Sequence, residues 1–445
     1  MEKIVIKGGK RLTGSIFVSG AKNVALKAMV AACLTDEKVT IKNIPLISDF
    51  MVMVAIIKEL GGKVKVVDHI VHIHMKKFKK EKISLEEAGK IRTSVMFLAP
   101  LLARMGKAII PNPGGCRIGA RPIDRTVEGL EKMGYSASYK SKDGFFYLHS
   151  KSEPAKKEIV YKFEKSTHTG TETLIMVACL LNGTKITLEN AAAEPEIDEL
   201  INLLNQMGAK ILRTKERTIV IQGVEKLKGT EFTIDSDRNE IVTLAVAAIV
   251  TKGDILVKGV QNVDLSPFIQ RLELAGGGVE QKKEGIRFFY KGELNKVDVE
   301  TSIYPGFMTD WQGPWAILMT QAKGESIIHE TVYENRFGYV KELGKMGADI
   351  ALFNPEIKNP EKVYNFNLSD NDDSYFHAIK VKGPTKLHNG VVEISDLRAG
   401  ATLVLAALSA AGESVIFGVE HLDRGYEKLE AGLGSLGANI KRIQE

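Results

Sequence analysis

Apolar and polar positions follow one pattern that recurs along the chain at intervals of about 70 to 90 residues. In each copy an Ala-rich helix, apolar on nearly every side, precedes a short β-branched strand and a loop. A second, amphipathic helix follows, and it ends at a glycine before another strand. The first copy consists of KNVALKAMVAACLT, DEKVTIKNIP and IIKELGGKVKVV, and the last consists of ATLVLAALSAAG, ESVIFGVE and LEAGLGSLGANIKRI. The pattern predicts six β-α-β-α-β-type repeats.

The two helices of a repeat have different expected environments. A helix that is apolar all round is buried completely, whereas one with a 3.6-residue stripe buries a single face. The glycine after the second helix is expected in the left-handed conformation that ends a helix and turns the chain into a strand. Six such repeats form one ring, one solenoid or two clusters of three, and the pattern alone does not choose among these.

The regular spacing is interrupted before the sixth repeat by a segment rich in Asn, Asp and Pro, residues 354–376. Such a composition is typical of turns. We interpret the segment as a surface insertion and prefer a structural loop to a functional lid. Gly432, Gly434 and Gly437 match GxGxxG, but they follow a helix rather than a strand, which argues against a dinucleotide site.

Composition narrows the class of protein. The 445 residues are 44% hydrophobic and 26% charged, which suits a soluble α/β protein of two to four domains and excludes disorder and a disulfide scaffold. The longest apolar runs, 241–250 and 399–412, are shorter than the roughly 18 residues of a membrane helix. The N-terminus lacks the pattern of a secretory signal, so we expect a cytoplasmic protein without membrane contact.

Charge and cysteine content point to small anionic ligands. Sixty-one basic and 55 acidic side chains give a net charge of +6, with no basic stripe interleaved with aromatic residues, so nucleic-acid binding is not expected. Cys33, Cys116 and Cys179 form no CxxC pair, which argues against structural zinc and a redox dithiol. No Walker A, HExxH or GxSxG motif is present.

Loops between the repeats carry residues that packing does not require. Lys22 and Asn23 precede the first buried helix, where backbone N–H groups favour an anion. Cys116 lies in a Pro-Gly-Gly loop followed by arginines, which favour a reactive thiolate. Asp396 and Arg398 begin the sixth buried helix; intra-repeat salt bridges are one explanation, and a shared anion-binding cleft is the other.

In these loop residues and in the motifs around them, the chain resembles the UDP-N-acetylglucosamine enolpyruvyl transferases (UDP-N-acetylglucosamine 1-carboxyvinyltransferases). The motifs extend in the expected order over nearly the whole chain. They are SGAKN at 19–23, PGGCRIGARPID at 113–124, NAAAEPEI at 190–197, YPGFMTD at 304–310, ENRF at 334–337, DLRA at 396–399 and DRGYE at 423–427. The Cys116 loop is the most specific, because the similar shikimate-pathway enolpyruvyl transferases lack it.

The resemblance implies an inside-out α/β barrel of two domains with three repeats each. Residues 21–233 would form the first domain, which carries the Cys116 loop. Residues 1–20 and 234–445 would form the second, with the active site in the cleft between the domains. The implied reaction transfers the enolpyruvyl group of phosphoenolpyruvate to the 3-hydroxyl of UDP-N-acetylglucosamine and releases phosphate, the first committed step of peptidoglycan precursor synthesis. No metal and no organic cofactor are implied, and we expect a monomer or weak homo-oligomer.

The resemblance also assigns residues to roles. The cations that bind phosphoenolpyruvate are matched by Lys22, Arg121 and Arg424. Of these, Lys22 and Arg424 are also implied to be catalytic. Further substrate-binding candidates are Asp396 and Arg398. Cys116 matches the general acid that also forms a covalent adduct, and Asp310 matches the general base. The positions implied to bind the nucleotide sugar are Lys22, Asn23, Arg92, Arg121, Pro122, Ile123, Asp124, Arg125, Thr167, His168, Thr169, Gly170, Asp310 and Val332.

Several positions depart from the family pattern. They are the stretch Thr167 to Gly170 in place of a small apolar segment, Arg125, the sequence DRNEIV at 237–242 and the insertion at 354–376. These departures leave open an enolpyruvyl transferase that uses another hydroxyl acceptor, either a modified nucleotide sugar or shikimate 3-phosphate. A silent nucleotide-sugar-binding homologue and an RNA-end-processing enzyme are the alternatives of a different class. The binding homologue would be free to lose Lys22, Cys116, Asp310 or Arg424. The RNA-end-processing enzyme would need a nucleotidyl-accepting histidine.

Overall fold

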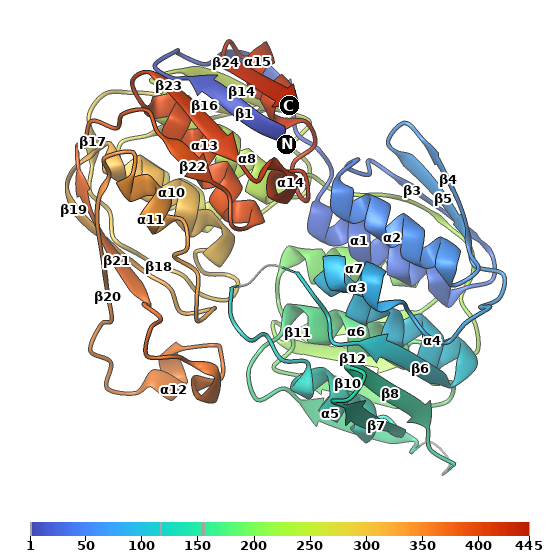
Figure 1. Cartoon of the computed structure of the whole chain (residues 1–445). Coiled ribbons are helices and arrows are strands. Elements are labelled where there is room, and N and C mark those ends of the chain that lie inside the picture. Colours follow the sequence, from blue (N-terminus) through green and yellow to red (C-terminus); the bar gives the residue numbers. More distant parts are fainter. Residues whose placement is uncertain (1, 116–117, 153–155, 445) are drawn as a thin grey trace. The chain divides into compact units, whose positions relative to one another are not determined.

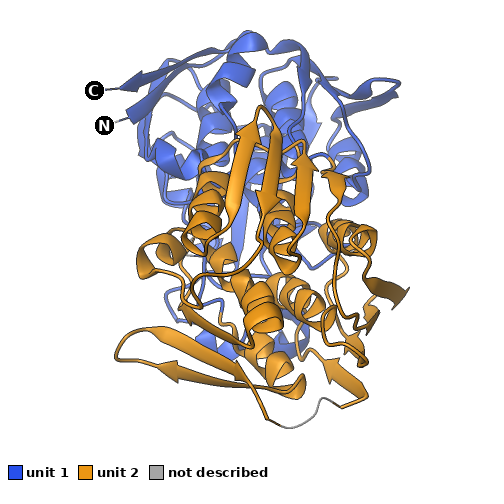
Figure 2. Ribbon diagram, turned by 90° about the vertical axis from the view of Figure 1, so that its right-hand side faces the viewer, with its two compact units in different colours: residues 1–19, 117–121, 236–445 blue, residues 20–116, 122–235 orange. Residues whose placement is uncertain are grey.

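The described residues of the computed structural model, 2–115, 118–152 and 156–444, fall into two compact units. Unit 1 comprises residues 1–19, 117–121 and 236–445, and unit 2 comprises 20–116 and 122–235 (Figure 2). The resemblance implied a first domain of 21–233 and did not anticipate that the segment 118–121 lies in unit 1. The physical reason is local, because the N–H of Asn335 donates to the carbonyl of Ile118 (3.3 Å).

Unit 2 contains the first three repeats in three sheets. The strand orders are β13-β3-β5-β4, β6-β8-β7 and β11-β12-β10-β9. The helices are α1 (Lys22–Ala31), η1 (Ala32–Leu34), α2 (Ser48–Glu59), α3 (Leu85–Lys90), η2 (Arg92–Phe97), α4 (Leu98–Met105), α5 (Asp124–Lys132), α6 (His168–Ala178) and α7 (Pro195–Gln206). The strands are β3 (Lys38–Lys42), β4 (Lys63–Val67), β5 (Ile70–His74), β6 (Lys107–Pro111), β7 (Tyr135–Lys140), β8 (Phe145–Ser150), β9 (Glu158–Lys162), β10 (Lys185–Glu189), β11 (Lys210–Lys215), β12 (Thr218–Gln222) and β13 (Glu231–Thr233).

Unit 1 contains the other three repeats, also in three sheets. The orders are β15-β16-β14-β2, β17-β19-β21-β20 with β18 beside β19, and β22-β23-β1-β24. The helices are α8 (Arg238–Val250), α9 (Ser266–Leu274), η3 (Thr309–Trp311), α10 (Gln312–Thr320), α11 (Val340–Gly344), α12 (Pro360–Val363), η4 (Leu368–Asp370), α13 (Leu397–Ser409), α14 (Val419–Leu422) and α15 (Leu429–Ser435). The strands are β1 (Glu2–Lys7), β2 (Thr13–Phe17), β14 (Asp254–Lys258), β15 (Gly278–Lys282), β16 (Gly285–Phe289), β17 (Leu294–Asn295), β18 (Val299–Glu300), β19 (Ala322–His329), β20 (Asp349–Phe353), β21 (Ala378–Gly383), β22 (Val391–Glu393), β23 (Glu413–Phe417) and β24 (Asn439–Gln444).

Each repeat passes its last strand to the sheet of the next repeat. In unit 2, β13 pairs parallel with β3, β9 pairs parallel with β10, and Lys82 forms a parallel bridge to Ile109. In unit 1, β17 and β18 pair parallel with β19, and β22 pairs parallel with β23. The N-terminal segment completes that circle, because β1 pairs with β24 and β2 pairs with β14. Each unit is therefore a closed ring of three repeats.

The apolar helices lie inside these rings, as their pattern predicts. In unit 1, α8, α10 and α13 contact one another, and Figure 1 shows them with strands around them. All described residues of α10 are buried, including Trp315, which is fully inaccessible. In unit 2, α1 and α6 both contact α4. The second repeat differs from its prediction: residues 92–97 form 3-10 helix η2, and regular α-helix begins only at Leu98. Pro100 accounts for this start, because proline has no N–H and fits only the first turn of a helix.

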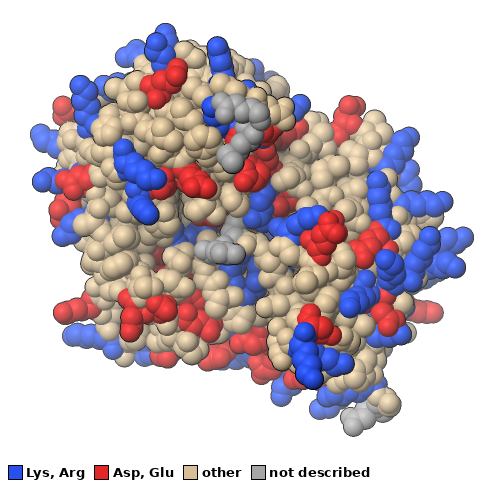
Figure 3. Space-filling model, in the orientation of Figure 1, with Lys and Arg blue, Asp and Glu red and all other residues tan. Residues whose placement is uncertain are grey.

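The described residues contain neither a membrane-crossing helix nor a metal-binding cluster. None of their helices has both the length and the hydropathy of a bilayer-crossing segment. They also contain no cluster of His, Cys, Asp and Glu side chains arranged to hold a metal ion. On the face shown in Figure 3, basic and acidic side chains are interspersed.

The predicted helix-ending glycines are confirmed. The six that follow the second helices have φ between 84° and 104°, and they are Gly61, Gly134, Gly208, Gly276, Gly347 and Gly437. An L-residue with a side chain rarely adopts these angles, so glycine keeps the turn from helix to strand free of strain.

We expect Gly208→Ala to lower the free energy of unfolding by about 1–2 kcal/mol, because alanine is strained at positive φ. A Cβ there would meet no atom within 4 Å, so crowding does not contribute. Gly344→Ala is the matched control, since that site is equally open and its φ is not positive. We expect this variant to gain up to about 1 kcal/mol. Urea unfolding measures both, and equal effects of the two substitutions would contradict the explanation.

Candidate active site

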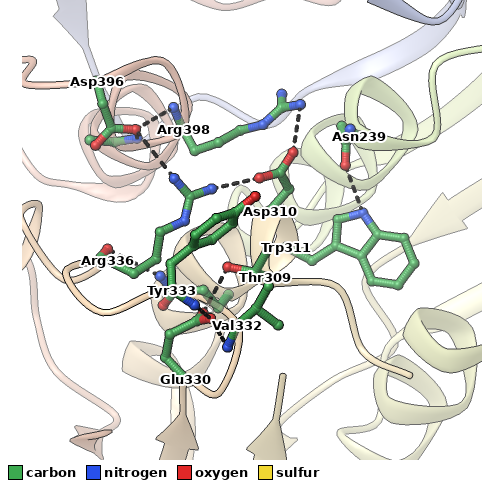
Figure 4. Close-up of polar contacts among 12 residues, drawn as sticks. Asn239, Thr309, Asp310, Trp311, Glu330, Val332, Tyr333, Arg336, Asp396 and Arg398 are labelled. Carbon is green, nitrogen blue, oxygen red and sulfur yellow. Dashed lines mark hydrogen bonds and ion pairs between the residues drawn. The ribbon is translucent and has the colours of Figure 1, made fainter. Parts of the chain in front are cut away.

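A carboxylate held by two arginines lies at the start of α10 in unit 1. Asp310, on η3, accepts from Arg336 Nη2 at 2.5 Å through Oδ1 and pairs with Arg398 Nη2 at 3.0 Å through Oδ2 (Figure 4). The side chain of Arg336 is 5% exposed and that of Asp310 is 21% exposed. The arginines lie on separate repeats, so the ring closure of unit 1 brings them to the same carboxylate.

Asp396 fixes one of these arginines through the helix that carries it. Its carboxylate accepts from the N–H groups of Arg398 (2.9 Å) and Ala399 (3.2 Å), which caps the N-terminus of α13. Asp396 also lies 3.9 Å from Arg336 Nη1. An aspartate at this position satisfies helix N–H groups that have no partner within the helix. The sequence suggested salt bridges within one repeat for Asp396 and Arg398, but their ion pairs with Arg336 and Asp310 join the sixth repeat to the fifth.

A fully buried glutamate, Glu330, is hydrogen-bonded to residues next to this carboxylate. Glu330 accepts from the hydroxyl of Thr309 (2.8 Å) and from the N–H groups of Val332 (2.8 Å) and Tyr333 (3.1 Å). Burial raises its pKa, an effect that the charge of Arg336 opposes. Since Thr309 adjoins Asp310, one side chain fixes both the aspartate and the Val332 segment.

The loop that carries Arg424 is fixed on both sides. Arg442 donates to both oxygens of Asp423, at 2.8 and 2.5 Å. On the other side the buried hydroxyl of Tyr426 lies 2.8 Å from Thr243 Oγ1 and accepts from Arg398 (3.2 Å). Bidentate pairing of this kind limits the orientations open to the chain. The Arg424 backbone is thus held between two immobilised neighbours.

Unit 2 contains a second group of charged side chains at helix N-termini. Lys22, the first residue of α1, forms a 2.8 Å ion pair with Asp49, and both side chains are nearly buried. One turn further along α1, Lys27 pairs with the inaccessible Glu172 at 2.9 Å. Burial raises the pKa of Glu172 to about 7, against the opposing charge of Lys27. Lysines at helix N-termini suit an anionic ligand.

The start of α6 carries polar side chains too, but unlike α1 it has a side-chain cap. Thr167 caps the helix by accepting from the N–H of Gly170 (3.3 Å), and His168 Nε2 lies 3.5 Å from Glu172 Oε1. The His168 side chain is 29% exposed, so one side of the imidazole faces solvent.

Residues 118–121 pack against the ENRF motif of unit 1. A Cβ on Gly119 would lie 1.8 Å from Glu334 Oε2, so a larger residue would displace that carboxylate, and the φ of 140° also favours glycine. Arg121 has φ 49° and its guanidinium carbon lies 5.4 Å from the centre of the Tyr333 ring, a cation–π distance. These contacts fix the C-terminal end of the Cys116 loop on unit 1.

The chain is similar to known proteins over nearly its whole length. A family model described as EPSP synthase (3-phosphoshikimate 1-carboxyvinyltransferase) matches residues 6–433. The chain is 40% identical over 444 residues to UDP-N-acetylglucosamine 1-carboxyvinyltransferase of Desulfatibacillum aliphaticivorans, with 100% of both chains covered. The chain belongs to the EPSP synthase family of enolpyruvyl transferases. A relative from Caldanaerobacter subterraneus subsp. tengcongensis, UDP-N-acetylglucosamine 1-carboxyvinyltransferase 3, is 39% identical over 445 residues, with 100% of both chains covered.

Solved structures support the fold of this enolpyruvyl transferase. The enolpyruvyl transferase NikO from Streptomyces tendae superposes with a TM-score of 0.85 at 22% identity, covering 100% of this chain and 99% of that one. EPSP synthase from Acinetobacter baumannii gives 0.73 at 16% identity, with 100% of both chains covered. The fold class expected from the repeats and motifs is confirmed.

The structure of this enolpyruvyl transferase places the predicted site residues in two groups. Unit 1 holds Arg121, Asp310, Val332, Asp396, Arg398 and Arg424, and it brings Asp310, Asp396 and Arg398 into one network. Unit 2 holds Lys22, Asn23, Arg92, Pro122, Ile123, Asp124, Arg125, Thr167, His168, Thr169 and Gly170. Cys116 lies outside the described residues. The roles of all these residues stay predictions.

Sequence reasoning missed several residues that organise the site. Asp49, Lys27 and Glu172 carry no motif signal, because each is found only through a partner distant in sequence. Arg336 and Tyr426 did have a signal, since they lie within the ENRF and DRGYE motifs. Their positions inside these motifs were therefore enough to name Arg336 and Tyr426 as candidate site residues.

We expect the stability of this enolpyruvyl transferase to fall as pH rises from about 4.5 to about 8, partly through Glu199 in α7. Burial raises its pKa from 4.5 to about 8, aided by Asp235 and Glu196 and opposed by the hydrogen bond from the Asp235 N–H. The folded state then binds a proton more tightly than the unfolded state over this range, so deprotonation at higher pH favours unfolding.

Glu199→Gln removes this proton but keeps an oxygen to accept from the Asp235 N–H, a 2.7 Å bond in the wild type. The two proteins should unfold similarly near pH 4.5, and the variant should be more stable by roughly 1–3 kcal/mol near pH 8. Thermal unfolding against pH measures the difference. Parallel curves for the two proteins would show that Glu199 does not contribute.

Proposed function

We propose that this chain transfers the enolpyruvyl group of phosphoenolpyruvate to the 3-hydroxyl of UDP-N-acetylglucosamine, with release of phosphate. The observation that carries the proposal is full-length identity of about 40% to relatives that bear this activity in their names. The reaction is the first committed step of peptidoglycan precursor synthesis, and we place it in the cytoplasm with a monomer or weak homo-oligomer as the active form.

Electrostatics supports the binding of both substrates. Phosphoenolpyruvate carries a phosphate and a carboxylate, so it requires several fixed cations, and we assign Lys22, Arg121, Arg398 and Arg424 to it. Fixed charges act without reorganisation when charge develops in the transition state. The N-termini of α1 and α6 supply further N–H groups, and the Thr167–Gly170 stretch is assigned to the diphosphate of the acceptor.

The addition step requires one proton to be removed and one to be delivered. The sugar oxygen forms a bond to C2 of phosphoenolpyruvate as its proton leaves to Asp310, while Cys116 donates a proton to C3. A base must be ionised before it accepts a proton, and the guanidinium groups of Arg336 and Arg398 stabilise the Asp310 carboxylate as an anion. Elimination then removes a proton from C3, breaks the C2–O bond to phosphate and restores the double bond.

The alternative acceptors are less well supported. Relatives at 37–40% identity share the name UDP-N-acetylglucosamine 1-carboxyvinyltransferase, whereas two EPSP synthase structures from Acinetobacter baumannii are 16–17% identical to this chain. The presence of a cysteine in the 113–124 loop also argues against shikimate 3-phosphate as acceptor.

We expect Asp310→Asn to lower kcat for phosphate release by about 10²–10⁴-fold, because an amide does not accept the hydroxyl proton. Phosphate released from phosphoenolpyruvate in the presence of UDP-N-acetylglucosamine measures the rate. Asp349→Asn is the matched control, since Asp349 is an exposed residue of β20 outside the site, and it should keep the wild-type rate. An Asp310→Asn rate within about threefold of wild type would exclude the general-base role.

We expect the epoxide fosfomycin to add once to the wild-type protein, at Cys116, and to abolish phosphate release. Cys33 and Cys179 are fully buried, and burial raises the pKa of Cys33 to about 12 and that of Cys179 also, so neither thiol is reactive. Intact mass and peptide mapping locate the adduct. Cys116→Ala should carry no adduct and release no phosphate, and alkylation of that variant at another cysteine would contradict the assignment.

A further inference from the structure

The segment 354–376 leaves the β20–β21 hairpin and returns to it. Phe353 and Ala378 are paired across the two strands, and Figure 1 shows α12 beyond their ends. Asn354 closes the neck, because its Oδ1 accepts from the N–H of His377 (2.8 Å) and its Nδ2 donates to the carbonyl of Tyr375 (3.1 Å). The segment is thus an ordered excursion with a fixed base.

Two aromatic side chains of the excursion are buried against unit 1. Tyr364 and Phe366 are 7% and 5% exposed, and their rings stack with centres 4.8 Å apart. Tyr364 also meets the ring of His329 edge-on at 5.7 Å, and both aromatic residues contact the ring of His377. A loop that only covered the surface would leave such side chains in water, so this burial indicates a docked element.

Between these two rings, the excursion bonds directly to the segment that carries Val332. The N–H of Asn365 donates to the carbonyl of Thr331 at 2.8 Å. On its other side Thr331 is bonded to Thr301, through its N–H (2.9 Å) and its hydroxyl (2.5 Å). The next N–H along the chain, that of Val332, donates to Glu330, whose own N–H donates to the carbonyl of His377 (2.7 Å). The excursion therefore contributes one of the hydrogen bonds that hold residues 330–332 in place.

An electrostatic interaction links the excursion to the end of the same segment. The negative charge of Asp370, on η4, adds to burial in raising the pKa of Glu334, while the charge of Arg121 opposes the rise. Glu334 is 2% exposed and packs against Gly119. The excursion thus acts on the 330–334 segment at Thr331 through a hydrogen bond and at Glu334 through charge.

We propose that residues 354–376 are an acceptor-positioning element that holds the 330–334 segment, and with it Val332, in the place that binds the nucleotide sugar. The inference rests on the proposed function, which assigns Val332 to the acceptor. Asn365 and the Tyr364–Phe366 pair are its positioning residues. Asn365 bonds the carbonyl of Thr331, directly before Val332, so the element governs the KM for the acceptor more strongly than that for phosphoenolpyruvate.

The first test replaces residues 355–376 by Gly-Gly, which retains Asn354, His377 and the β20–β21 pairing. We expect the KM for UDP-N-acetylglucosamine to rise about tenfold, with kcat and the KM for phosphoenolpyruvate within about twofold of wild type. The control is Asp372→Ala, because Asp372 is exposed and its side chain accepts hydrogen bonds from Ser374, which also lies within the excursion. An unchanged acceptor KM in the shortened protein, or equal rises in both KM values, would overturn the inference.

A second variant tests the same bond without shortening the chain. Asn365→Pro removes the N–H that Thr331 accepts, and Tyr364 already has the extended backbone (φ −83°, ψ 130°) that precedes proline. We expect the same selective rise in acceptor KM and faster hydrogen exchange at the N–H groups of Val332 and Tyr333. Wild-type exchange there would overturn the inference, even if the shortened protein fails to fold.

Two readouts separate this inference from the proposed function. Phosphate release by the wild type that depends on UDP-N-acetylglucosamine tests the function alone. Exchange at Val332 and Tyr333 in the Asn365→Pro protein tests the positioning alone, because it requires no turnover. Loss of protection together with a wild type that releases no phosphate would retain the structural element and reject the function.

Discussion

The structure depends on one constraint: no repeat encloses its own apolar helix. A helix that is apolar on all sides must be shielded from water by protein on all sides, whereas one small sheet shields only one side of it. Each repeat therefore passes its last strand to the next sheet, and three repeats close into a ring around three helices. In unit 1 the N-terminal strands β1 and β2 complete this closure, so residues separated by nearly the whole chain share a sheet.

Ring closure also explains where charged groups collect. Because the interior helices are apolar along their length, their N-terminal N–H groups are the main polar sites left at one end, and Asp237 and Asp396 cap α8 and α13 there. Side chains from different repeats meet at these ends. Asp310 of the fifth repeat pairs with Arg398 of the sixth, and Tyr426 of the sixth bonds Thr243 of the fourth. The site is thus a consequence of how the helices are packed.

The second level of organisation is support for the Asp310 region from buried polar groups. Glu330 fixes Thr309 on one side and the N–H groups of Val332 and Tyr333 on the other, and an unpaired buried carboxylate would be costly. The excursion at 354–376 adds a second hold on the same segment through Thr331. A chain departure that resembles a surface loop in sequence is therefore bonded to the segment that we assign to the acceptor.

Local patterns of polarity, backbone freedom and consecutive motif residues were enough to predict the repeats, the buried helices, the six glycine turns and the family. The motifs also named Asp310, Asp396 and Arg398 as site residues, but they did not show that these residues share one network. The folded chain was needed to show that three repeats close a ring, that Lys22 pairs with Asp49, that Lys27 pairs with Glu172, and that Asn365 bonds Thr331. These contacts join residues far apart in the chain, and their partners are set by packing, which no short stretch of sequence encodes.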